Sequence, residues 1–431
     1  MPRKFVQTER PSVLTRRRFQ FVGALAVGAA VPLGLRILLP STQVIEVATV
    51  NAFIANMAAV VIAFWMRLSI ETYPGIRRSA VILPAALTGH GLTLVWFVLT
   101  RFPYDRVGLT LGFVLHVLWM YLVYVYGDRA IRRRFAVVPF GAIAPLKQID
   151  SVDWVELRRP SLADAKRCNA IVADFSADLP DKWEAFLADA ALDGRIVYQV
   201  KQLNESLTGR VELDHLSENS FGSLLPARGY FYLKTAVDFL AALVMLPLVL
   251  PLMALAALAI YLDDGGPVVF KQRRLGHAGR SFTAFKFRTM SMLTPSTAEA
   301  DQESERRALA TDDDDPRITR VGAVLRKYRI DELPQIANIL MGQMSWIGPR
   351  PEPELLTRWW VAEIPFYRYR HVVKPGISGW AQVNLGYVSG VEGINRKLQY
   401  DFYYIKYFSP WLDMLILFRT IKTMLSGFGA K

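Results

Sequence analysis

Four long apolar stretches open this chain of 431 residues, at residues 19–39, 45–66, 80–99 and 107–126. A helix needs about 20 consecutive apolar residues to cross the hydrocarbon core of a bilayer, and each stretch has about that length. The first stretch follows a run of three arginines, as a signal peptide would, but no small-residue cleavage site follows it. The pattern therefore predicts four transmembrane helices within residues 19–127, the first of them a retained anchor.

The distribution of lysine and arginine predicts how these helices are oriented. Basic residues crowd residues 1–18, the connection between the second and third stretches, and the segment after residue 128. Because basic loops tend to stay in the cytoplasm, we expect the N-terminus and everything after residue 128 to be cytoplasmic. The net charge is +13, which suits anionic lipid and phosphorylated substrates. We expect no nucleic-acid partner, because no nucleic-acid-binding motif accompanies the charge.

A fifth apolar stretch, residues 239–262, does not fit this topology as a spanning helix. Basic residues lie on both sides of it, so a crossing would place the strongly basic remainder of the chain outside. Pro247 and Pro251 lie in its middle, where each removes a helix hydrogen bond and can bend the helix. We therefore predict a re-entrant membrane helix over about residues 234–262, with an ordinary spanning helix as the alternative.

Residues 128–220 have the pattern of a small cytoplasmic α/β module. Short apolar runs predict strands at 136–140, 152–157, 171–175 and 195–200, with a helix at 181–192. This alternation is typical of a parallel sheet covered by helices. The module lacks a glycine fingerprint, so no dinucleotide is assigned to it. A regulatory role, or an oligomerising role that supports a homodimer, is our expectation.

Two adjacent carboxylates, Asp331 and Glu332, lie within the segment RIDELPQ at residues 329–335. Apolar residues recur after them at helical spacing, and Pro334 suits the first turn of a helix. Backbone N–H groups and the helix dipole attract phosphate at such a position. One carboxylate could attack a phosphoryl group while the other holds Mg²⁺. The alternative is a pair of acids that merely stabilises a helix N-terminus.

Cations surround this pair in the sequence. Lys286 and Arg288 alternate with Phe285 and Phe287, which predicts a strand with cations on one face and aromatic rings on the other. Such cations can hold a diphosphate, although a solvated strand face has the same pattern. The residues considered for substrate binding are Lys271, Arg273, Lys286, Arg288, Arg317, Arg320, Arg326, Arg350, Lys374 and Gln382.

Two further segments have more than one interpretation. The four aspartates at residues 312–315 could bind Mg²⁺, but such a run is typical of a solvated loop, and we assign it no function. Residues 411–425 combine apolar side chains with Arg419 and Lys422, which predicts an interfacial amphipathic helix. An ordinary core helix is the alternative for this segment.

From about residue 234 to the end, the chain resembles the bacterial sugar transferases, the monotopic polyprenyl-phosphate phosphoglycosyl transferases. The apolar stretches and the α/β module before it resemble the larger members, which start exopolysaccharide, capsule or O-antigen repeat units. The resemblance implies an α/β membrane protein with four N-terminal transmembrane helices, a small Rossmann-like module and a mostly helical catalytic domain at 228–431. The segments that carry the match, in order, are 271–276, 285–290, 315–322, 325–335, 348–351 and 374–384.

The same resemblance implies a reaction and its participants. Asp331 would attack the β-phosphorus of a UDP-sugar and release UMP, and undecaprenyl phosphate would then take the sugar phosphate from the aspartyl intermediate. Glu332 would bind Mg²⁺, and Arg326 and Arg350 would contact phosphates. The re-entrant helix would hold the catalytic domain in the lipid of the bacterial inner membrane, on its cytoplasmic face.

Two alternatives remain beside this assignment. The first is a membrane-anchored regulatory protein with an inactive transferase domain, against which the intact acidic pair argues. The second keeps the enzyme class but transfers the sugar phosphate directly, without a covalent intermediate. Glucose, galactose and N-acetylated sugars are all compatible with the sequence as donors.

Overall fold

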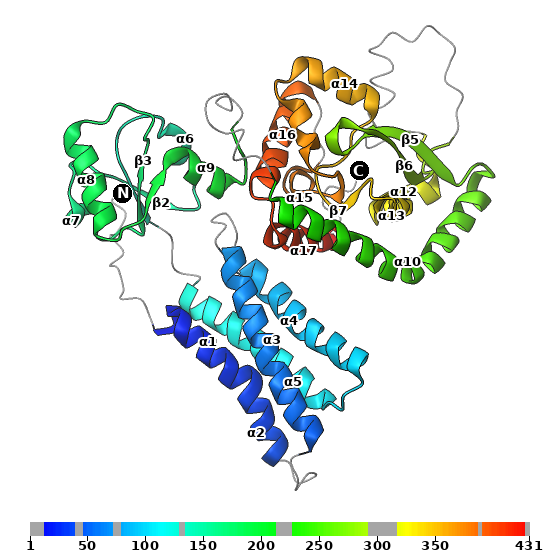
Figure 1. Cartoon of the computed structure of the whole chain (residues 1–431), viewed down its shortest axis with the longest axis horizontal. Coiled ribbons are helices and arrows are strands. Elements are labelled where there is room, and N and C mark those ends of the chain that lie inside the picture. The colour runs from blue at the N-terminus through cyan, green and yellow to red at the C-terminus, as the bar shows by residue number, and fades with distance from the viewer. Residues whose placement is uncertain are drawn as a thin grey trace. The chain divides into compact units, whose positions relative to one another are not determined.

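The computed structural model describes residues 13–38, 46–71, 79–128, 134–212, 226–291, 317–386 and 390–426 (Figure 1). The aspartate run at 312–315 and the first 12 residues of the basic N-terminus lie outside these residues. Contacts divide the chain into two compact units, Met1–Gly209 and Arg210–Lys431.

The first unit begins with helices that are long and apolar enough to cross a membrane, at Arg17–Leu38, Val47–Ile70, Val81–Thr100 and Arg106–Gly127. All four apolar stretches of the sequence are thus confirmed as helices of this kind. Gly89 lets the helices at Val47–Ile70 and Val81–Thr100 approach closely, because a Cβ at Gly89 would lie 2.3 Å from the carbonyl oxygen of Ala59. Their elements are η1 (Val13–Thr15), α1 (Arg17–Leu25), η2 (Ala26–Ala30), α2 (Val31–Leu38), α3 (Val47–Glu71), α4 (Ser79–Thr100), α5 (Arg106–Val123) and η3 (Tyr124–Asp128).

The α/β module follows in the same unit. Its strands β1 (Arg134–Val137), β2 (Asp153–Glu156), β3 (Ala170–Ala173) and β4 (Val197–Gln199) form a parallel sheet in the order β2-β1-β3-β4. Helices α7 (Leu162–Ala165) and α8 (Asp181–Leu192) pack on one face, and α6 (Ala144–Lys147) and α9 (Val200–Thr208) pack on the other. The predicted strands and the predicted helix at 181–192 are confirmed. Both faces are covered, as parallel sheets require.

The carboxylate of Asp174 lies directly after β3, at the carboxyl ends of β1 and β3. Ligands of doubly wound sheets bind at such a point, where the strand order reverses. Here Asp174 accepts hydrogen bonds from the backbone N–H groups of Ala142, at 2.8 Å, and Ser176, at 3.0 Å. The side-chain amide of Gln199 also donates to it, at 3.3 Å. Asp174 therefore occupies backbone donors that a bound phosphate would need.

A single long helix, α10 (Arg228–Asp264), leads into the second unit and bends partway along its length (Figure 1). It contains both prolines of the fifth apolar stretch and is another helix long and apolar enough to cross a membrane. Its first half packs through Ala242 against Ile336 and Ile339, and its second half packs through Ile260 against Phe287 and Leu325. Both halves thus contact one and the same domain.

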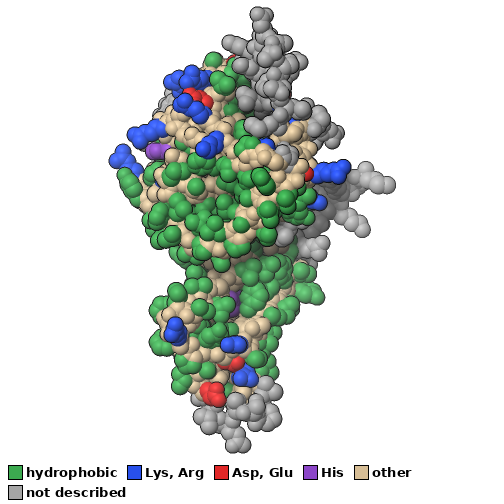
Figure 2. Space-filling view, turned by 90° about the vertical axis from the view of Figure 1, so that its right-hand side faces the viewer, with side chains coloured by type: hydrophobic (Ala, Val, Ile, Leu, Met, Phe, Trp, Pro, Cys, Tyr) green, Lys and Arg blue, Asp and Glu red, His purple; other side chains and the backbone are tan. Residues whose placement is uncertain are grey.

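The opposite face of α10 is apolar and exposed. Leu240, Val244, Leu248, Leu255 and Leu262 are among its exposed side chains. Figure 2 shows hydrophobic side chains gathered over the surface along this helix. A patch of this kind marks a surface that contacts lipid or another apolar partner.

The rest of the second unit is mostly helical, as predicted. Strands β5 (Val269–Leu275) and β6 (Ser281–Phe287) form an antiparallel hairpin around η5 (His277–Gly279), and β7 (Ser345–Ile347) pairs in parallel with β8 (Gly376–Ser378). The helices are α12 (Arg320–Lys327), η6 (Ile330–Gln335), α13 (Ile336–Leu340), α14 (Glu354–Glu363), η7 (Tyr367–Val372), α15 (Trp380–Leu385), α16 (Gly390–Lys406) and α17 (Pro410–Ser426).

The C-terminal helix α17 combines the two interpretations of residues 411–425. Leu412 and Ile416 are buried in the unit, whereas Leu417 and Ile421 are exposed. One face of the helix is therefore a core face, and the other presents apolar side chains at the surface.

Candidate active site

The acidic pair lies in the first turn of a helical segment, as the sequence predicts. Arg329 is the N-cap residue of η6 and has a left-handed backbone (φ 53°). Asp331 and Glu332 follow it in the first turn of η6. The turn is a 3₁₀ helix that runs into α13, and Pro334 lies within it. Tightened 3₁₀ turns are common at helix N-termini.

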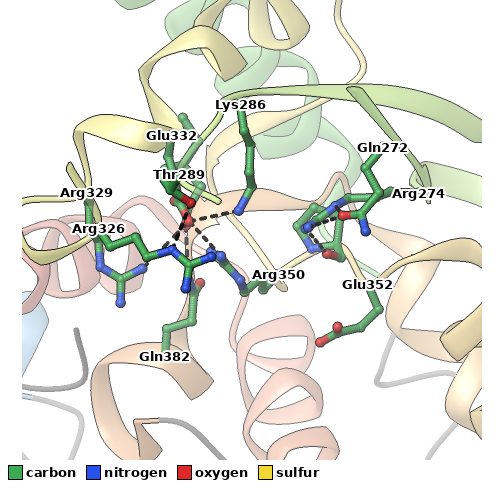
Figure 3. Close-up of polar contacts among 12 residues, drawn as sticks. Gln272, Arg274, Lys286, Thr289, Arg326, Arg329, Glu332, Arg350, Glu352 and Gln382 are labelled. Carbon is green, nitrogen blue, oxygen red and sulfur yellow. Dashed lines mark hydrogen bonds and ion pairs between the residues drawn. The ribbon is translucent and has the colours of Figure 1, made fainter. Parts of the chain in front are cut away.

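Glu332 is the centre of the charged cluster in Figure 3. Its side chain is 5% exposed, and its Oε1 accepts a hydrogen bond from Nη2 of Arg350 at 2.6 Å. The ammonium of Lys286 lies 3.5 Å from the same oxygen, and Nη1 of Arg329 lies 4.0 Å away. Burial opposes ionisation of Glu332, but the charges of Arg350 and Lys286 outweigh it and hold its pKa well below the usual range.

Asp331 has a different electrostatic environment from its neighbour. Burial, together with the negative charge of Glu332, raises the pKa of Asp331. The charges of Lys286, Arg350 and Arg326 oppose that rise and favour the ionised form. Burial also lowers the pKa of Lys286 to about 8, against the attraction of Glu332. Two carboxylates and several cations thus share one poorly solvated site, which suits a ligand with several phosphate oxygens.

Three elements besides η6 position the cations of this cluster. Lys286 lies on β6, next to the end of the strand, and Arg350 follows β7 on the turn between Pro349 and Pro351. Arg326 lies in the last turn of α12, and its Nε donates to Oγ1 of Thr289 at 2.9 Å. The structure therefore brings together Asp331, Glu332, Lys286, Arg326 and Arg350, all of which the sequence selects.

Arg274 belongs to the same electrostatic cluster, although sequence reasoning did not select it. It is 8% exposed, and its Nη1 donates to the carbonyl oxygen of Pro351 at 2.5 Å. Burial lowers the pKa of Arg274 to about 10, and its charge in turn helps to lower the pKa of Lys286. Arg274 therefore ties the hairpin to the turn that carries Arg350.

The alternation of side chains along β5 is the signal that could have identified Arg274. Gln272 and Arg274 face inward, whereas Lys271 and Arg273 are exposed. The structure pairs Arg273 with Glu354 of α14, at 3.3 Å, on the surface. The period of two predicts that alternate cations share a face, but it does not say which face meets the site.

Arg370 and Asp401 form a second support that the sequence does not reveal. Arg370 is 3% exposed and Asp401 is 1% exposed, and Nη2 of Arg370 lies 2.8 Å from Oδ2 of Asp401. The same Nη2 donates to the backbone carbonyl of Arg350 at 2.9 Å. The pair therefore holds the backbone of Arg350 in place. Arg370 and Asp401 lie 31 positions apart in the sequence, so no local motif links them.

The structure places the other selected cations at different points of the unit. Arg288 follows β6, and its guanidinium lies against Gly266 after α10, where a Cβ would meet Nη1 at 2.0 Å. The ammonium of Lys374 lies 6.0 Å from the ring of Phe231, beside the first half of α10. Arg320 is exposed at the start of α12, and the Arg317 carbonyl accepts a hydrogen bond from the backbone of Ser291. Their roles in substrate binding stay predictions.

Gln382 lies in α15, within the segment 374–384 that carries part of the family resemblance. Its side chain points toward the charged cluster in Figure 3. Nε2 donates to the carbonyl oxygen of Ile377 at 3.1 Å, whereas Oε1 is buried and has no hydrogen-bond partner among the described residues.

One carboxylate oxygen of Glu332 has the properties of a metal ligand. Oε2 is buried and has no hydrogen-bond partner in the described part of the chain. The described residues contain no group of three or more His, Cys, Asp or Glu side chains that could enclose a metal ion. Mg²⁺ commonly takes one or two carboxylates and completes its shell with substrate phosphates and water. The residues present therefore fit Mg²⁺ as an ion shared with a phosphorylated substrate.

A buried polar network joins α10 to the strand that leads to Arg350. Oγ of Ser345 on β7 donates to Asp238 at 2.6 Å, and Nζ of Lys234 lies 2.8 Å from Asp413. The hydroxyl of Tyr404 donates to the other oxygen of Asp413 at 2.8 Å. Hydrogen bonds and an ion pair thus connect the apolar helix to the strand that precedes Arg350.

Comparison with known proteins identifies the family of this chain. The family described as "Bacterial sugar transferase" matches residues 229–427. Over 361 residues the chain is 46% identical to the UDP-N-acetylgalactosamine-undecaprenyl-phosphate N-acetylgalactosaminephosphotransferase of Aeromonas hydrophila, and the alignment covers 83% of each protein. The chain belongs to the bacterial sugar transferase family, which confirms the resemblance.

Two further relatives match over a shorter stretch. The UDP-glucose:undecaprenyl-phosphate glucose-1-phosphate transferase of Escherichia coli is 38% identical over 191 residues, which cover 44% of this chain and 39% of that protein. The exopolysaccharide production protein ExoY of Rhizobium meliloti is 37% identical over 205 residues, which cover 46% of this chain and 87% of that protein.

Proposed function

We propose that this protein transfers a sugar 1-phosphate from a UDP-sugar to undecaprenyl phosphate and releases UMP. The observation that carries the proposal is the placement of Asp331 and Glu332 in one helical turn, among Lys286, Arg326 and Arg350. The names of two relatives describe undecaprenyl-phosphate sugar transferases with different sugars. The product would be the first lipid-linked unit of an exopolysaccharide, capsule or O-antigen.

In the proposed reaction Asp331 is the nucleophile. One of its carboxylate oxygens bonds to the β-phosphorus, and the bond from that phosphorus to the oxygen bridging the two phosphates breaks. UMP leaves with the electron pair, and an aspartyl phosphosugar remains. A phosphate oxygen of undecaprenyl phosphate then bonds to the same phosphorus, and the Asp331 carboxylate leaves. One phosphoanhydride replaces another, so positioning and charge neutralisation can supply most of the catalysis.

The surrounding cations serve both steps in this scheme. Lys286, Arg326 and Arg350 favour the ionised form of Asp331, and they can contact the phosphates that approach it. Glu332 would hold Mg²⁺ through Oε2, and the metal would neutralise charge on the diphosphate. Because Oε1 of Glu332 is held by Arg350, Oε2 keeps a fixed direction.

For the membrane arrangement we propose four spanning helices and a re-entrant α10. Both halves of α10 pack against the same domain, so a crossing would require that domain to lie on both sides of the bilayer. The catalytic domain, residues 228–431, would then lie on the cytoplasmic face of the inner membrane, where undecaprenyl phosphate is accessible. For the module at 128–220 we propose a regulatory role or contacts in a homodimer.

The test is the mass of the intact protein after incubation with Mg²⁺ and single UDP-sugars, without lipid phosphate. A phosphosugar adduct, absent from Asp331→Asn, is the expected result and identifies both the nucleophile and the sugar. Absence of an adduct, with UMP release only after undecaprenyl phosphate is added, would favour direct transfer. Absence of UMP release under every condition would contradict the proposed function.

A further inference from the structure

The amide oxygen of Gln382 is a buried acceptor without a donor. Among the residues that the structure describes, no hydrogen-bond donor reaches Oε1 of Gln382. A buried polar atom without a partner is unfavourable, so such atoms are rare in native proteins and each calls for an explanation, such as a functional role or a bound water or ion. The atom therefore marks a position where a bound molecule would supply an N–H or O–H group.

The orientation of this amide is fixed by its other end. Nε2 of Gln382 donates to the backbone carbonyl of Ile377 at 3.1 Å. If the two ends of the amide were exchanged, its oxygen would face the carbonyl oxygen of Ile377 and neither could donate. Oε1 is thus the end that faces the cluster.

Oε1 of Gln382 lies next to the turn that carries Arg350. A Cβ built on Gly379 would lie 2.4 Å from the carbonyl oxygen of Gly348 and 3.2 Å from Oε1 of Gln382. Gly348 precedes Pro349 and Arg350, and Figure 3 shows Gln382 and Arg350 at the same side of the cluster. A substrate whose phosphate meets Arg350 would therefore have a neighbouring group within reach of Gln382.

Helix α15, which carries Gln382, is held in place by contacts of its own residues. Nδ2 of Asn384 donates to the carbonyl oxygen of Trp380 at 2.7 Å, and the guanidinium of Arg419 lies 4.6 Å from the Trp380 ring. Trp380 is 5% exposed and stacks on Tyr403. A preorganised acceptor of this kind discriminates between ligands better than a mobile one.

The chemistry of Oε1 of Gln382 determines which kind of ligand group it can bind. The cations of the site donate, and therefore suit phosphate oxygens, whereas an amide oxygen can only accept. The group that meets Oε1 must therefore donate an N–H or O–H, which a phosphate oxygen without a proton cannot do. In a UDP-sugar the part bonded directly to the reacting β-phosphate is the sugar, and its hydroxyl and acetamido groups are such donors. Resting on the proposed function, we propose that Oε1 of Gln382 accepts a hydrogen bond from a sugar hydroxyl or acetamido N–H and thereby helps to select the sugar.

The experiment combines a change in the enzyme with a change in the substrate. Wild type, Gln382→Met and the control Gln148→Met, an exposed site in the α/β module, are compared with the preferred UDP-sugar and with its deoxy analogues. Removal of the acceptor should lower kcat/KM for the preferred sugar roughly 10- to 100-fold. One analogue, the one that lacks the bonded group, should react equally with wild type and Gln382→Met. The inhibition constant of UMP should stay unchanged in all three proteins.

Two results would overturn the assignment. An equal loss with every analogue would mean that Gln382 only supports the structure around α15. A parallel weakening of UMP inhibition would mean that Gln382 contacts uridine. If Gln382→Met does not fold, Gln382→Glu keeps an acceptor oxygen and should keep the ranking of the analogues, whereas a changed ranking contradicts the proposal. Absence of UMP release by the wild type from every donor would instead contradict the proposed function, on which this inference rests.

Discussion

The carboxylate of Glu332 accepts a 2.6 Å hydrogen bond from Nη2 of Arg350, which lies 18 residues further along the chain. The bond occupies Oε1 and leaves Oε2 buried without a hydrogen-bond partner in the described part of the chain. Arg350 is itself held by Arg370 through its backbone carbonyl. One carboxylate oxygen is thereby used for structure, and the other is available to a ligand.

Glu332→Gln tests this division of the two oxygens. The amide keeps the shape of the side chain but removes the charge that attracts Mg²⁺, so the Mg²⁺ concentration for half-maximal UMP release should rise about tenfold or more. That change corresponds to about 1.4 kcal/mol of binding. Glu354→Gln, which alters a surface ion-pair partner of Arg273, should leave the Mg²⁺ titration unchanged. An identical titration for Glu332→Gln and wild type would argue against the metal role.

Asp331→Asn tests the nucleophile. An amide cannot form the acyl phosphate, so UMP release should fall by at least about 1000-fold. Thermal unfolding should change little, because the substitution preserves the shape of the side chain. Asp189→Asn, at an exposed site in α8, serves as the control and should retain full activity. Wild-type activity in Asp331→Asn would end the assignment.

Glu352 links the stability of the protein to pH. Burial opposes its ionisation, but the charges of Lys397 and Arg370 outweigh it and hold the pKa of Glu352 at about 2, below the value of 4.5 for an unperturbed Glu. A lowered folded-state pKa adds stability that is fully present above about pH 4.5 and is lost as the pH falls toward 2. The free energy of unfolding should therefore decrease over that range.

Glu352→Gln should remove this part of the pH dependence. At pH 7 the variant should be less stable than wild type by roughly 3 kcal/mol, because each unit of pKa shift corresponds to about 1.4 kcal/mol. Chemical unfolding at pH 7 and at pH 3 measures both effects. Glu156→Gln, which breaks an exposed pair with Lys147, should have little effect at either pH. Parallel pH profiles for wild type and Glu352→Gln would contradict the assignment.

The proposed re-entry of α10 predicts labelling of both its ends from one side. The single cysteine, Cys168, is first replaced by serine, and new cysteines are placed at Tyr232 and Pro267, which are both exposed. A membrane-impermeant maleimide should modify both from the cytoplasmic side. Phe102→Cys, in the connection between α4 and α5, should react from the opposite side and so provides the control. Labelling of the two α10 positions from opposite sides would show a spanning helix.

The features that the sequence predicts correctly are local ones. Hydropathy over about 20 residues identifies the four helices, and the alternation of Lys286 with Phe285 and Phe287 identifies strand β6. The acidic pair and Pro334 identify the turn of η6. Each of these signals lies within a single helix, strand or turn, so a single sequence is enough to read it.

The features that the sequence does not reveal depend on distant contacts. Arg370 and Asp401 are ordinary charged residues in the sequence, and only the packing of η7 on α16 buries them beneath Arg350. The choice between Arg273 and Arg274 depends on which face of the hairpin meets the cluster. The sequence also does not reveal that Lys374 lies near the ring of Phe231, and its role in substrate binding stays a prediction.

The contacts at both ends of α10 also bear on how the protein responds to bilayer thickness. A lone spanning helix adapts to a thicker or thinner membrane by tilting. In α10, the hydrogen bond from Ser345 to Asp238 and the packing of Ile260 on Leu325 attach both halves of the helix to the second unit, which opposes a tilt of α10 alone. In the proposed membrane arrangement, hydrophobic mismatch should therefore be absorbed by the four N-terminal helices, while the depth of α10 and of the attached Asp331 relative to the acyl chains changes little.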